Sequence, residues 1–405
     1  MDRAGEEMEM MLRYQQRAGA QGPGIRGGSG TVRGWDRAFL IGRARSEECQ
    51  LDAAAVAAYF PLDKVLRGVS ALVGRVFGVA LTEVDMRPGE NWAAGVRKLR
   101  VSTGVGQGGG EEEIGTVYLD LSPRPHKFPH AAHFVIRCGR QRNRGGGGSD
   151  SGRQQPAVAL VCNFGGGQQM TSGSSALLSH SEVETFLHEL GHAMHSVLSD
   201  TQYQHLSGTR CAMDLVEVPS HLFEYFAWDP GALSLISGHR VTGDPMPAEM
   251  VRRLKRGKEM FGATDLQQQI VFALTDLEVH ALGGAGSASV SDIATEVQRK
   301  HSLMPVEPGT AWELRFGHLV GYASTYYSYV YARCLAAELW GRFFAEDSLA
   351  PGAGEMLRDG LLRHGGAIAP AEVLRGLLGD AALRTPPGGQ GNAPDPSRAL
   401  AELES

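Results

Sequence analysis

The chain has 405 residues, 42% of them hydrophobic, and a formal net charge of −6 from 39 basic and 45 acidic side chains. This length and hydrophobic content allow a sizeable buried core in one large or two modest domains. The sequence has no basic stripe, zinc-finger spacing or RNA-binding aromatic motif, so nucleic-acid binding is not expected. No apolar run approaches the roughly 18 residues of a membrane span. The five cysteines are scattered without a C-x-x-C pair, which fits a reducing compartment.

The N-terminal region gives weak structural signals. Residues 1–34 begin with the acidic stretch MDRAGEEMEMMLRYQQRAGAQ and are expected to form a poorly ordered segment with a short helix. This start lacks the Arg- and Ser-rich, acid-poor character of a transit peptide. Glycine-rich stretches fit flexible insertions rather than phosphate loops, because none follows a strand in G-x-x-x-x-G-K form. They lie at 19–30, 104–110, 145–148 and 165–173.

The framework before residue 180 is predicted to combine helices with a small sheet. Residues 51–82 have the pattern of a helix pair. Three extended runs, 115–121, 130–138 and 156–163, are rich in Val, Tyr, Phe and Ile and predict strands. An edge strand of such a sheet is able to pair with an extended peptide. Because 181–380 is overwhelmingly helical in pattern, we expect a mainly α fold with a small β-sheet beside the helix described next.

The stretch SHSEVETFLHELGHAMHSVLSD, residues 179–200, predicts an amphipathic helix. Ser181 followed by Glu184 has the S-x-x-E form of a capping box, which satisfies backbone amides at a helix start. Apolar residues then recur at helical spacing and indicate a face that packs on a core. These residues are Val183, Phe186, Leu187, Leu190, Met194, Val197 and Leu198.

The same helix carries the pattern H-E-x-x-H. His188 and His192 lie one turn apart, so both imidazoles can point at one place. In this pattern two neutral imidazoles bind one Zn²⁺, and the intervening Glu189 serves as general base. Gly191 has no side chain and allows another backbone to approach closely. The alternative is a surface helix with incidental histidines.

A catalytic zinc needs a third protein ligand. The metzincin pattern fails, because His195 stands where its glycine belongs. The segment CAMDLVEVPSHLFEYF, residues 211–226, offers Glu217 instead, since an acidic residue on a mostly apolar segment is costly to bury unless it is paired or bound to metal. Pro219 in this segment either occupies a first helical turn or forces a kink. Further along the same stripe lie His221 and Glu224.

These two segments resemble the thimet oligopeptidase (M3) family of zinc metallopeptidases. In that family an H-E-F-G-H-x-x-H helix is followed at this spacing by a V-E-x-P-S segment that bears the glutamate ligand. The resemblance runs from about Trp35 to about Asp380 and includes GTVYLDLSPRPHKFPHAAHFVIRCGR and TAWELRFGHLVGYASTYYSYVYARCLAAELW. Within the family, SGTRC followed by VEVPSH, and FGHLVGYASTYYSY, are more similar to mitochondrial intermediate peptidases than to cytosolic oligopeptidases.

The resemblance implies roles for residues of the first two segments. The zinc ligands, for one Zn²⁺ per chain, are matched by His188, His192 and Glu217, and the general base is matched by Glu189. Leu190 replaces the usual phenylalanine on the apolar stripe, which should alter packing more than chemistry. His195 belongs to the motif without being a ligand, and it is expected either to make a hydrogen bond that supports the site or to be a satisfied buried histidine.

The later segment supplies further donors. Peptide hydrolysis passes through a tetrahedral oxyanion, and each donor to it is typically worth about 10²–10³ in rate. By the resemblance, residues that bind substrate and the transition state are matched by His318, Tyr326 and Tyr329. Tyr322 matches less securely, because the chain is one residue shorter here than the cytosolic oligopeptidases. From spacing alone, the tyrosines at 326 and 329 are more typical of core aromatics, and His318, bracketed by glycines, is expected in a mobile loop.

The expected domain organisation is a metallopeptidase catalytic domain over 35–383 and a flexible tail over 384–405. The family's N-terminal helical half is absent, so we expect a partial chain, with a genuinely short protein as the alternative. A metalloendopeptidase would cleave short or unfolded peptides, including remnants of imported precursors in the mitochondrial matrix. A cytosolic or plastidial oligopeptidase and a zinc-binding but catalytically poor peptide-binding fragment are the alternatives. We expect a monomer.

Overall fold

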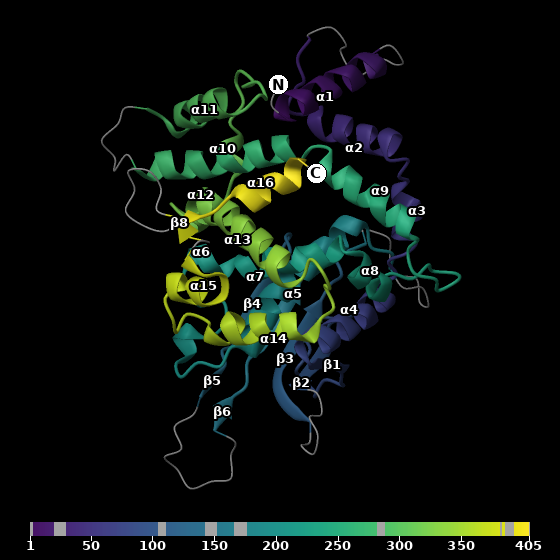
Figure 1. Ribbon diagram of the computed structural model, residues 1–405, viewed down its shortest axis with the longest axis vertical. Coiled ribbons are helices and arrows are strands. Elements are labelled where there is room, and N and C mark those ends of the chain that lie inside the picture. The colour runs from purple at the N-terminus through teal and green to yellow at the C-terminus, as the bar shows by residue number, and fades with distance from the viewer. Residues whose placement is uncertain are drawn as a thin grey trace. The chain divides into compact units, whose positions relative to one another are not determined.

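The chain folds into two compact units, each built from separate stretches of sequence (Figure 1). The computed structural model describes residues 3–19, 30–103, 111–141, 152–165, 176–281, 288–380, 383–384 and 393–404. Unit 1 comprises Met1–Asp52, Glu249–Tyr331 and Pro396–Ser405, and unit 2 comprises Ala53–Ala248 and Ala332–Asp395. The glycine-rich stretches of the sequence fall almost wholly outside the described residues.

Unit 1 is helical throughout its described part. Its elements are α1 (Arg3–Gly19), α2 (Arg37–Glu48), α9 (Ala248–Glu259), α10 (Gly262–Ala281), α11 (Val290–His301), α12 (His318–Gly321), the start of α13 (Tyr327–Phe343) and α16 (Ser397–Glu404). The core of the unit includes Met11 of α1, Leu40 of α2 and Phe261 before α10. The Glu7 carboxylate accepts the backbone N–H groups of Ala263 and Thr264 at 3.0 and 2.8 Å, which joins α1 to the start of α10.

The first and last segments of the chain each contain a helix in their described parts. A short helix was expected within residues 1–34, whereas α1 spans 17 residues and buries Met11 and Tyr14. The tail after 384 contains helix α16 in its described part. Both segments pack in unit 1, whose other elements come from the middle of the chain.

Unit 2 contains a five-stranded sheet with helices. The strand order is β1 (Val79–Glu83), β2 (Arg97–Thr103), β3 (Glu112–Asp120), β7 (Ala157–Val161) and β4 (Ala132–Arg137). Strands β3 and β7 are parallel, and the other neighbours are antiparallel. The helices are α3 (Ala53–Ala57), α4 (Leu62–Phe77), α5 (His180–Leu198), α6 (Met213–Val216), α7 (Val218–Glu224), α8 (Pro230–Ile236), α14 (Pro351–Gly360) and α15 (Pro370–Leu378), together with the rest of α13.

The predicted fold class is confirmed: the chain is mainly helical with a small sheet beside the helix that carries H-E-x-x-H. The three predicted strands correspond to β3, β4 and β7. The sheet also contains β1 and β2, and β1 takes up the end of the 51–82 stretch that was predicted to be a helix pair. Both remaining parts of that stretch are helical, as α3 and α4.

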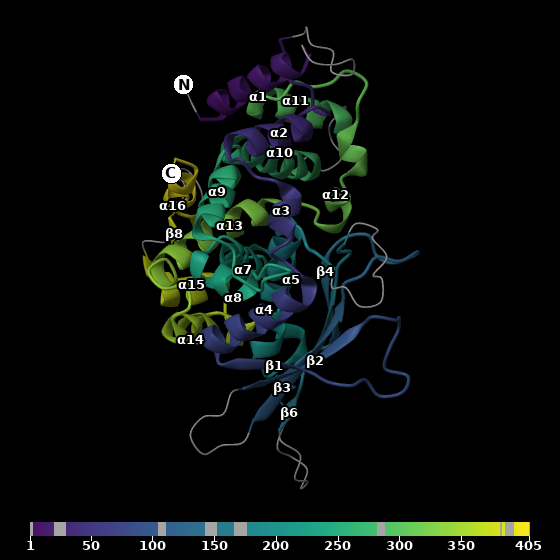
Figure 2. The same ribbon diagram turned by 90° about the vertical axis from the view of Figure 1, so that its right-hand side faces the viewer.

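Helix α5 packs between the sheet and α7 (Figure 2). It contacts β3, β4 and β7 as well as α7, and most of its side chains are buried. The capping box is formed by Ser179 and Glu182, not by Ser181 and Glu184, because the helix begins two residues earlier than predicted. The Glu184 carboxylate instead accepts the indole N–H of Trp228 at 2.6 Å.

Candidate metal centre

Helices α5 and α7 touch at Gly191. A Cβ atom at this position would lie 2.7 Å from both the Pro219 carbonyl oxygen and the Ser220 Cα, closer than real Cβ contacts occur. Only glycine therefore allows the two backbones to approach in this way, as the sequence suggested. Pro219 occupies the first turn of α7, where a missing N–H costs nothing, so no kink is needed.

This contact brings three candidate ligands together. The Glu217 Oε2 atom lies 3.5 Å from His188 Nε2 and 3.2 Å from His192 Nε2. A tetrahedral site with metal bonds of about 2.0–2.1 Å separates its ligand atoms by about 3.3–3.4 Å. Two imidazole nitrogens and a carboxylate oxygen are also a donor set that Zn²⁺ favours. The predicted trio therefore fits a divalent metal in both spacing and chemistry.

Glu217 is a buried carboxylate that depends on its two histidine partners. Its side chain is 5% exposed, and burial opposes its ionisation. The His188 and His192 imidazoles nevertheless hold the pKa of Glu217 well below its usual range. The Ser220 hydroxyl donates to the same Oε2 atom at 2.9 Å. The carboxylate is thus kept charged, as a metal ligand must be.

Glu224 supports the first ligand. Its Oε1 atom accepts Nδ1–H of His188 at 2.7 Å and Nδ1–H of His221 at 3.1 Å. Burial would lower the pKa of His188, but Glu217 and Glu224 together raise it to about 10. A carboxylate on the second ring nitrogen fixes the orientation of a metal-binding histidine. The sequence placed His221 and Glu224 on the stripe of Glu217 but gave neither residue a role.

Glu189 lies beside the trio and beside the sheet. Its carboxyl group is buried, and this burial raises its pKa, while His188 and His192 act in the opposite direction. The backbone of His133 on β4 is a further neighbour that lowers the pKa of this group. Because β4 is an edge strand of the described sheet, the candidate base adjoins the edge to which an extended peptide would add.

His195 is fully buried, and neither ring nitrogen has a hydrogen-bond partner among the described residues. Burial, with a smaller contribution from His192, lowers the pKa of His195 to about 3, so the ring is neutral. The nearby His133 ring makes its own bond, between Nε2 and the Ser196 hydroxyl at 3.1 Å. The supporting hydrogen bond expected of His195 does not occur among these residues.

The later candidate residues gather in unit 1, whereas the metal centre belongs to unit 2. The His318 ring lies 5.3 Å from the rings of Tyr322 and Tyr326 and 5.9 Å from that of Tyr329. His318 begins the short helix α12 rather than lying in an irregular loop. Tyr326 is buried, and its hydroxyl donates to Gln269 Oε1 at 3.0 Å.

The profile of Peptidase family M3 matches residues 2–386. The chain belongs to family M3. It is 39% identical over 369 residues to the mitochondrial intermediate peptidase of Arabidopsis thaliana, covering 91% of this chain and 50% of that protein. It is 37% identical over 347 residues to the mitochondrial intermediate peptidase of Homo sapiens, covering 85% of this chain and 46% of that protein.

These comparisons confirm the family resemblance drawn from the sequence. The M3 chain described here spans about half the length of the curated relatives it matches. Because M3 proteins are metallopeptidases, the family agrees with a metal centre at His188, His192 and Glu217. No helix in the described ranges is long and apolar enough to cross a membrane.

Proposed function

We propose that this chain is the catalytic part of a zinc metalloendopeptidase that cleaves short or unfolded peptides. The observation that carries this proposal is the convergence of His188, His192 and Glu217 at ligand spacing, with Glu189 next to them. One Zn²⁺ held by these three residues would polarise the scissile carbonyl group and activate water. The alternative of incidental surface histidines does not explain why Glu217 is buried between two of them.

The residues of unit 2 then have distinct tasks. Glu189 takes a proton from water and later delivers it to the leaving amine, and its burial brings its pKa towards the range that suits a general base. Glu224 holds His188 in its ligand orientation. An extended peptide adds to the β4 edge, where its backbone is aligned beside Glu189.

The remaining candidate residues are hydroxyl and imidazole groups of unit 1. We propose that His318, Tyr326 and Tyr329 donate to the oxyanion and to the substrate backbone, with Tyr322 in support. Tyr326 reaches this role only by exchanging its hydrogen bond with Gln269 for one with substrate. His195, on α5 itself, keeps a neutral, buried ring.

The names of the relatives suggest the setting. Both peptidases compared above are called mitochondrial intermediate peptidases, so we propose the mitochondrial matrix as the compartment and imported precursors as substrates. A zinc-binding but catalytically poor fragment remains a second candidate, because this chain covers only about half of each relative.

Glu189→Gln tests the proposal. The variant keeps the shape of the side chain and removes the base, so it should bind one zinc per chain while hydrolysis of an internally quenched peptide falls by about 10²–10⁴. Elemental analysis and initial rates, with and without a chelator, give both numbers. Glu184→Gln on the same helix is the matched control, since Glu184 contacts Trp228 and not the metal ligands.

Two results would contradict this assignment. Turnover by Glu189→Gln above about a hundredth of the unmodified rate would show that another base operates. Full zinc content in Glu217→Ala would remove Glu217 from the ligand set. A wild-type chain that binds zinc and peptide without cleaving it would favour the peptide-binding fragment.

A further inference from the structure

We propose that Lys127 is a positioning residue that fixes the edge strand β4, and through it the peptide and Glu189. The inference rests on the proposed peptidase function. Lys127 lies in the connection between β3 and β4, residues 121–131, outside the metal centre. Its side chain is only 2% exposed, which is unusual for an ammonium group and requires a full set of oxygen partners.

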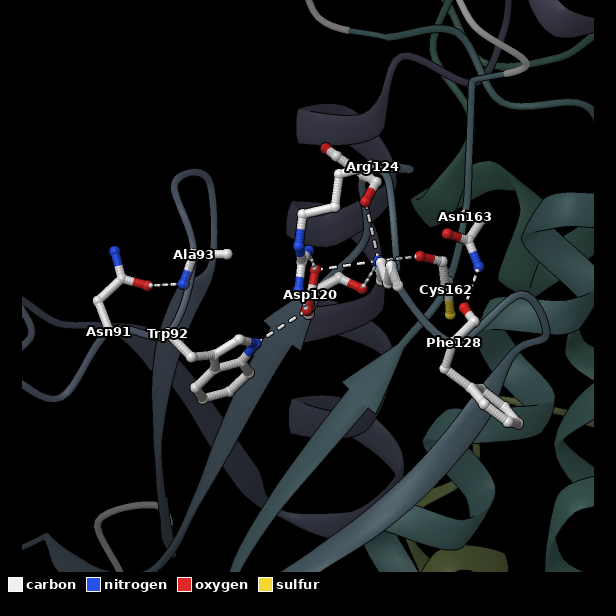
Figure 3. Close-up of polar contacts among 10 residues, drawn as sticks. Asn91, Trp92, Ala93, Asp120, Arg124, Phe128, Cys162 and Asn163 are labelled. Atoms are coloured by element: carbon white, nitrogen blue, oxygen red, sulfur yellow. Dashed lines mark hydrogen bonds and ion pairs between the residues drawn. The ribbon is translucent and has the colours of Figure 1, made fainter.

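The Lys127 ammonium has those partners. It donates to the backbone carbonyl oxygens of Asp120 and Ser122, both at 2.9 Å, and to that of Cys162. It also pairs with the Asp120 carboxylate at 2.9 Å. Asp120 ends β3 and Cys162 follows the parallel strand β7, so a single cation joins the carboxyl ends of these two strands to the connection that leads from β3 to β4. Figure 3 shows Asp120 and Cys162 at these strand ends.

The charge at this point is balanced by Asp120. Its carboxylate also accepts hydrogen bonds from both terminal nitrogens of Arg124, at 2.6 and 2.8 Å, and from the indole N–H of Trp92, at 2.9 Å (Figure 3). Burial opposes ionisation, yet Arg124, Trp92 and Lys127 lower the pKa of Asp120 to about 2. The Asp120 carboxylate therefore stays charged at neutral pH beside the Lys127 ammonium, and both groups have hydrogen-bond partners.

The pinned connection leads directly into the functional strand. Asn163 Nδ2 donates to the Phe128 carbonyl oxygen at 2.9 Å, which holds the chain next to Lys127 (Figure 3). Four residues later β4 begins, and its second residue, His133, has its backbone beside Glu189, where it lowers the pKa of that carboxyl group. The His133 ring bonds the Ser196 hydroxyl on the ligand helix. The place of β4 relative to Glu189 thus depends on the connection that Lys127 fixes.

The candidate metal ligands are held mainly by a different contact. His188, His192 and Glu217 lie on α5 and next to α7, and the two helices meet at Gly191. Strand β4 reaches this centre only through His133, whose ring centroid lies 6.0 Å from that of His192. Loss of the Lys127 ammonium should therefore weaken peptide alignment while zinc binding is retained. A residue that only stabilised the fold would not separate the two properties.

The test is chemical rescue of Lys127→Ala in the full chain. The missing part of the side chain corresponds to n-propylammonium. We expect the variant to keep one zinc per chain and to lose about tenfold or more in kcat/KM for a quenched peptide, mainly through KM. Added n-propylammonium should restore most of that loss, whereas propan-1-ol, which has the same length but no charge, should not.

Lys98→Ala is the matched control. Lys98 on β2 also forms an ion pair with a carboxylate, to Glu90 at 2.6 Å, and among the described residues it takes no part in the carbonyl contacts of Lys127. The Lys98→Ala variant should have an unchanged KM, and n-propylammonium should not alter its activity. If Lys98→Ala raised KM as much as Lys127→Ala does, the proposal would be overturned.

Amide hydrogen exchange of residues 132–137 gives a readout without catalysis. Faster exchange there in Lys127→Ala, reversed by n-propylammonium, supports the proposal even if the wild-type chain cleaves no peptide, so failure of the proposed function is seen separately. Unchanged exchange and unchanged KM would overturn it. If Lys127→Ala does not fold, Lys127→Gln, which keeps two donors, takes its place, and a normal KM with normal β4 exchange would again count against the inference.

Discussion

The Glu224 carboxylate restrains the orientation of the imidazole ring of the candidate ligand His188. Its single Oε1 atom accepts from His188 and from His221, so the imidazole that faces Glu217 has its other nitrogen already committed. The hydrogen bond between His221 and Glu224 is local, because both residues lie on α7. Helix α7, which begins directly after Glu217, therefore also restrains the His188 ring through Glu224.

At this scale we expect Glu224→Ala to weaken metal binding without abolishing it. Loss of the carboxylate frees the His188 ring, and such supporting partners typically contribute about 10–100-fold in metal affinity. Competition with a chromogenic chelator measures the dissociation constant. Glu182→Ala, which removes the capping box at the far end of α5, is a control that alters the helix but not the ring. An unchanged metal affinity in Glu224→Ala would assign Glu224 to packing.

The sequence pointed to the three candidate ligands because their signals are local. Spacing on one helix identified His188 and His192, and an acidic residue in an apolar stripe identified Glu217. The contact of Glu189 with the His133 backbone could not be predicted in this way, because it depends on the register of β4 against α5. The absence of a hydrogen-bond partner for His195 likewise depends on what surrounds a buried ring.

At the scale of elements, the short distance between the backbones of α5 and α7 depends on the absence of a side chain at Gly191. We predict that Gly191→Ala forces the helices apart, because the new Cβ meets backbone atoms that have no rotamer with which to yield. The cost should be about 1–3 kcal/mol of unfolding free energy, as for other overpacked sites. Metal affinity should fall as well, since Glu217 moves with α7.

Urea unfolding and chelator competition measure the two effects of Gly191→Ala. Gly376→Ala in α15 is the matched control, because a Cβ there meets nothing within 4 Å. That change should be neutral or stabilising by up to about 1 kcal/mol, as alanine is the better helix former. Equal destabilisation by both substitutions would show that the contact with α7 is not the cause.

Strands β1 and β2 show why sequence patterns predicted only part of the sheet. Strand β2 contains Arg97, Lys98 and Arg100, a composition that argues against a strand. These charges are tolerated because partners on neighbouring segments compensate them, as in the ion pair between Arg97 and Glu83 of β1. Such compensation is visible only after the strands have been paired.

The whole molecule distributes its candidate chemistry over two units. The ligands and Glu189 belong to unit 2, and His318 with its tyrosines belongs to unit 1. The sequence predicts one catalytic domain over 35–383, and that range contributes residues to both units. Periodicity identifies helices, but it cannot reveal that α1 packs on α10 as well as on its neighbour in sequence, α2.

At this scale we predict that zinc stabilises unit 2 selectively. A ligand at 100 times its dissociation constant adds about 2.7 kcal/mol to the free energy of unfolding. Amide hydrogen exchange with zinc and with chelator should show added protection in α5 and α7 and little change in α1 and α10. Glu217→Ala should abolish the difference. Equal protection of both units would show instead that they unfold together.

The bond between Glu7 and the start of α10 has a consequence for synthesis on the ribosome. The two partners are separated by 256 residues. At translation rates of about 5–20 residues per second, α1 emerges on the order of tens of seconds before α10 exists. Throughout this interval Met11 and Tyr14 of the nascent chain have α2 as a packing partner but not Phe261, while the sheet and the helices α5 and α7 of unit 2 are completed. The side of α1 that meets α10 is thus left for a holding chaperone to shield.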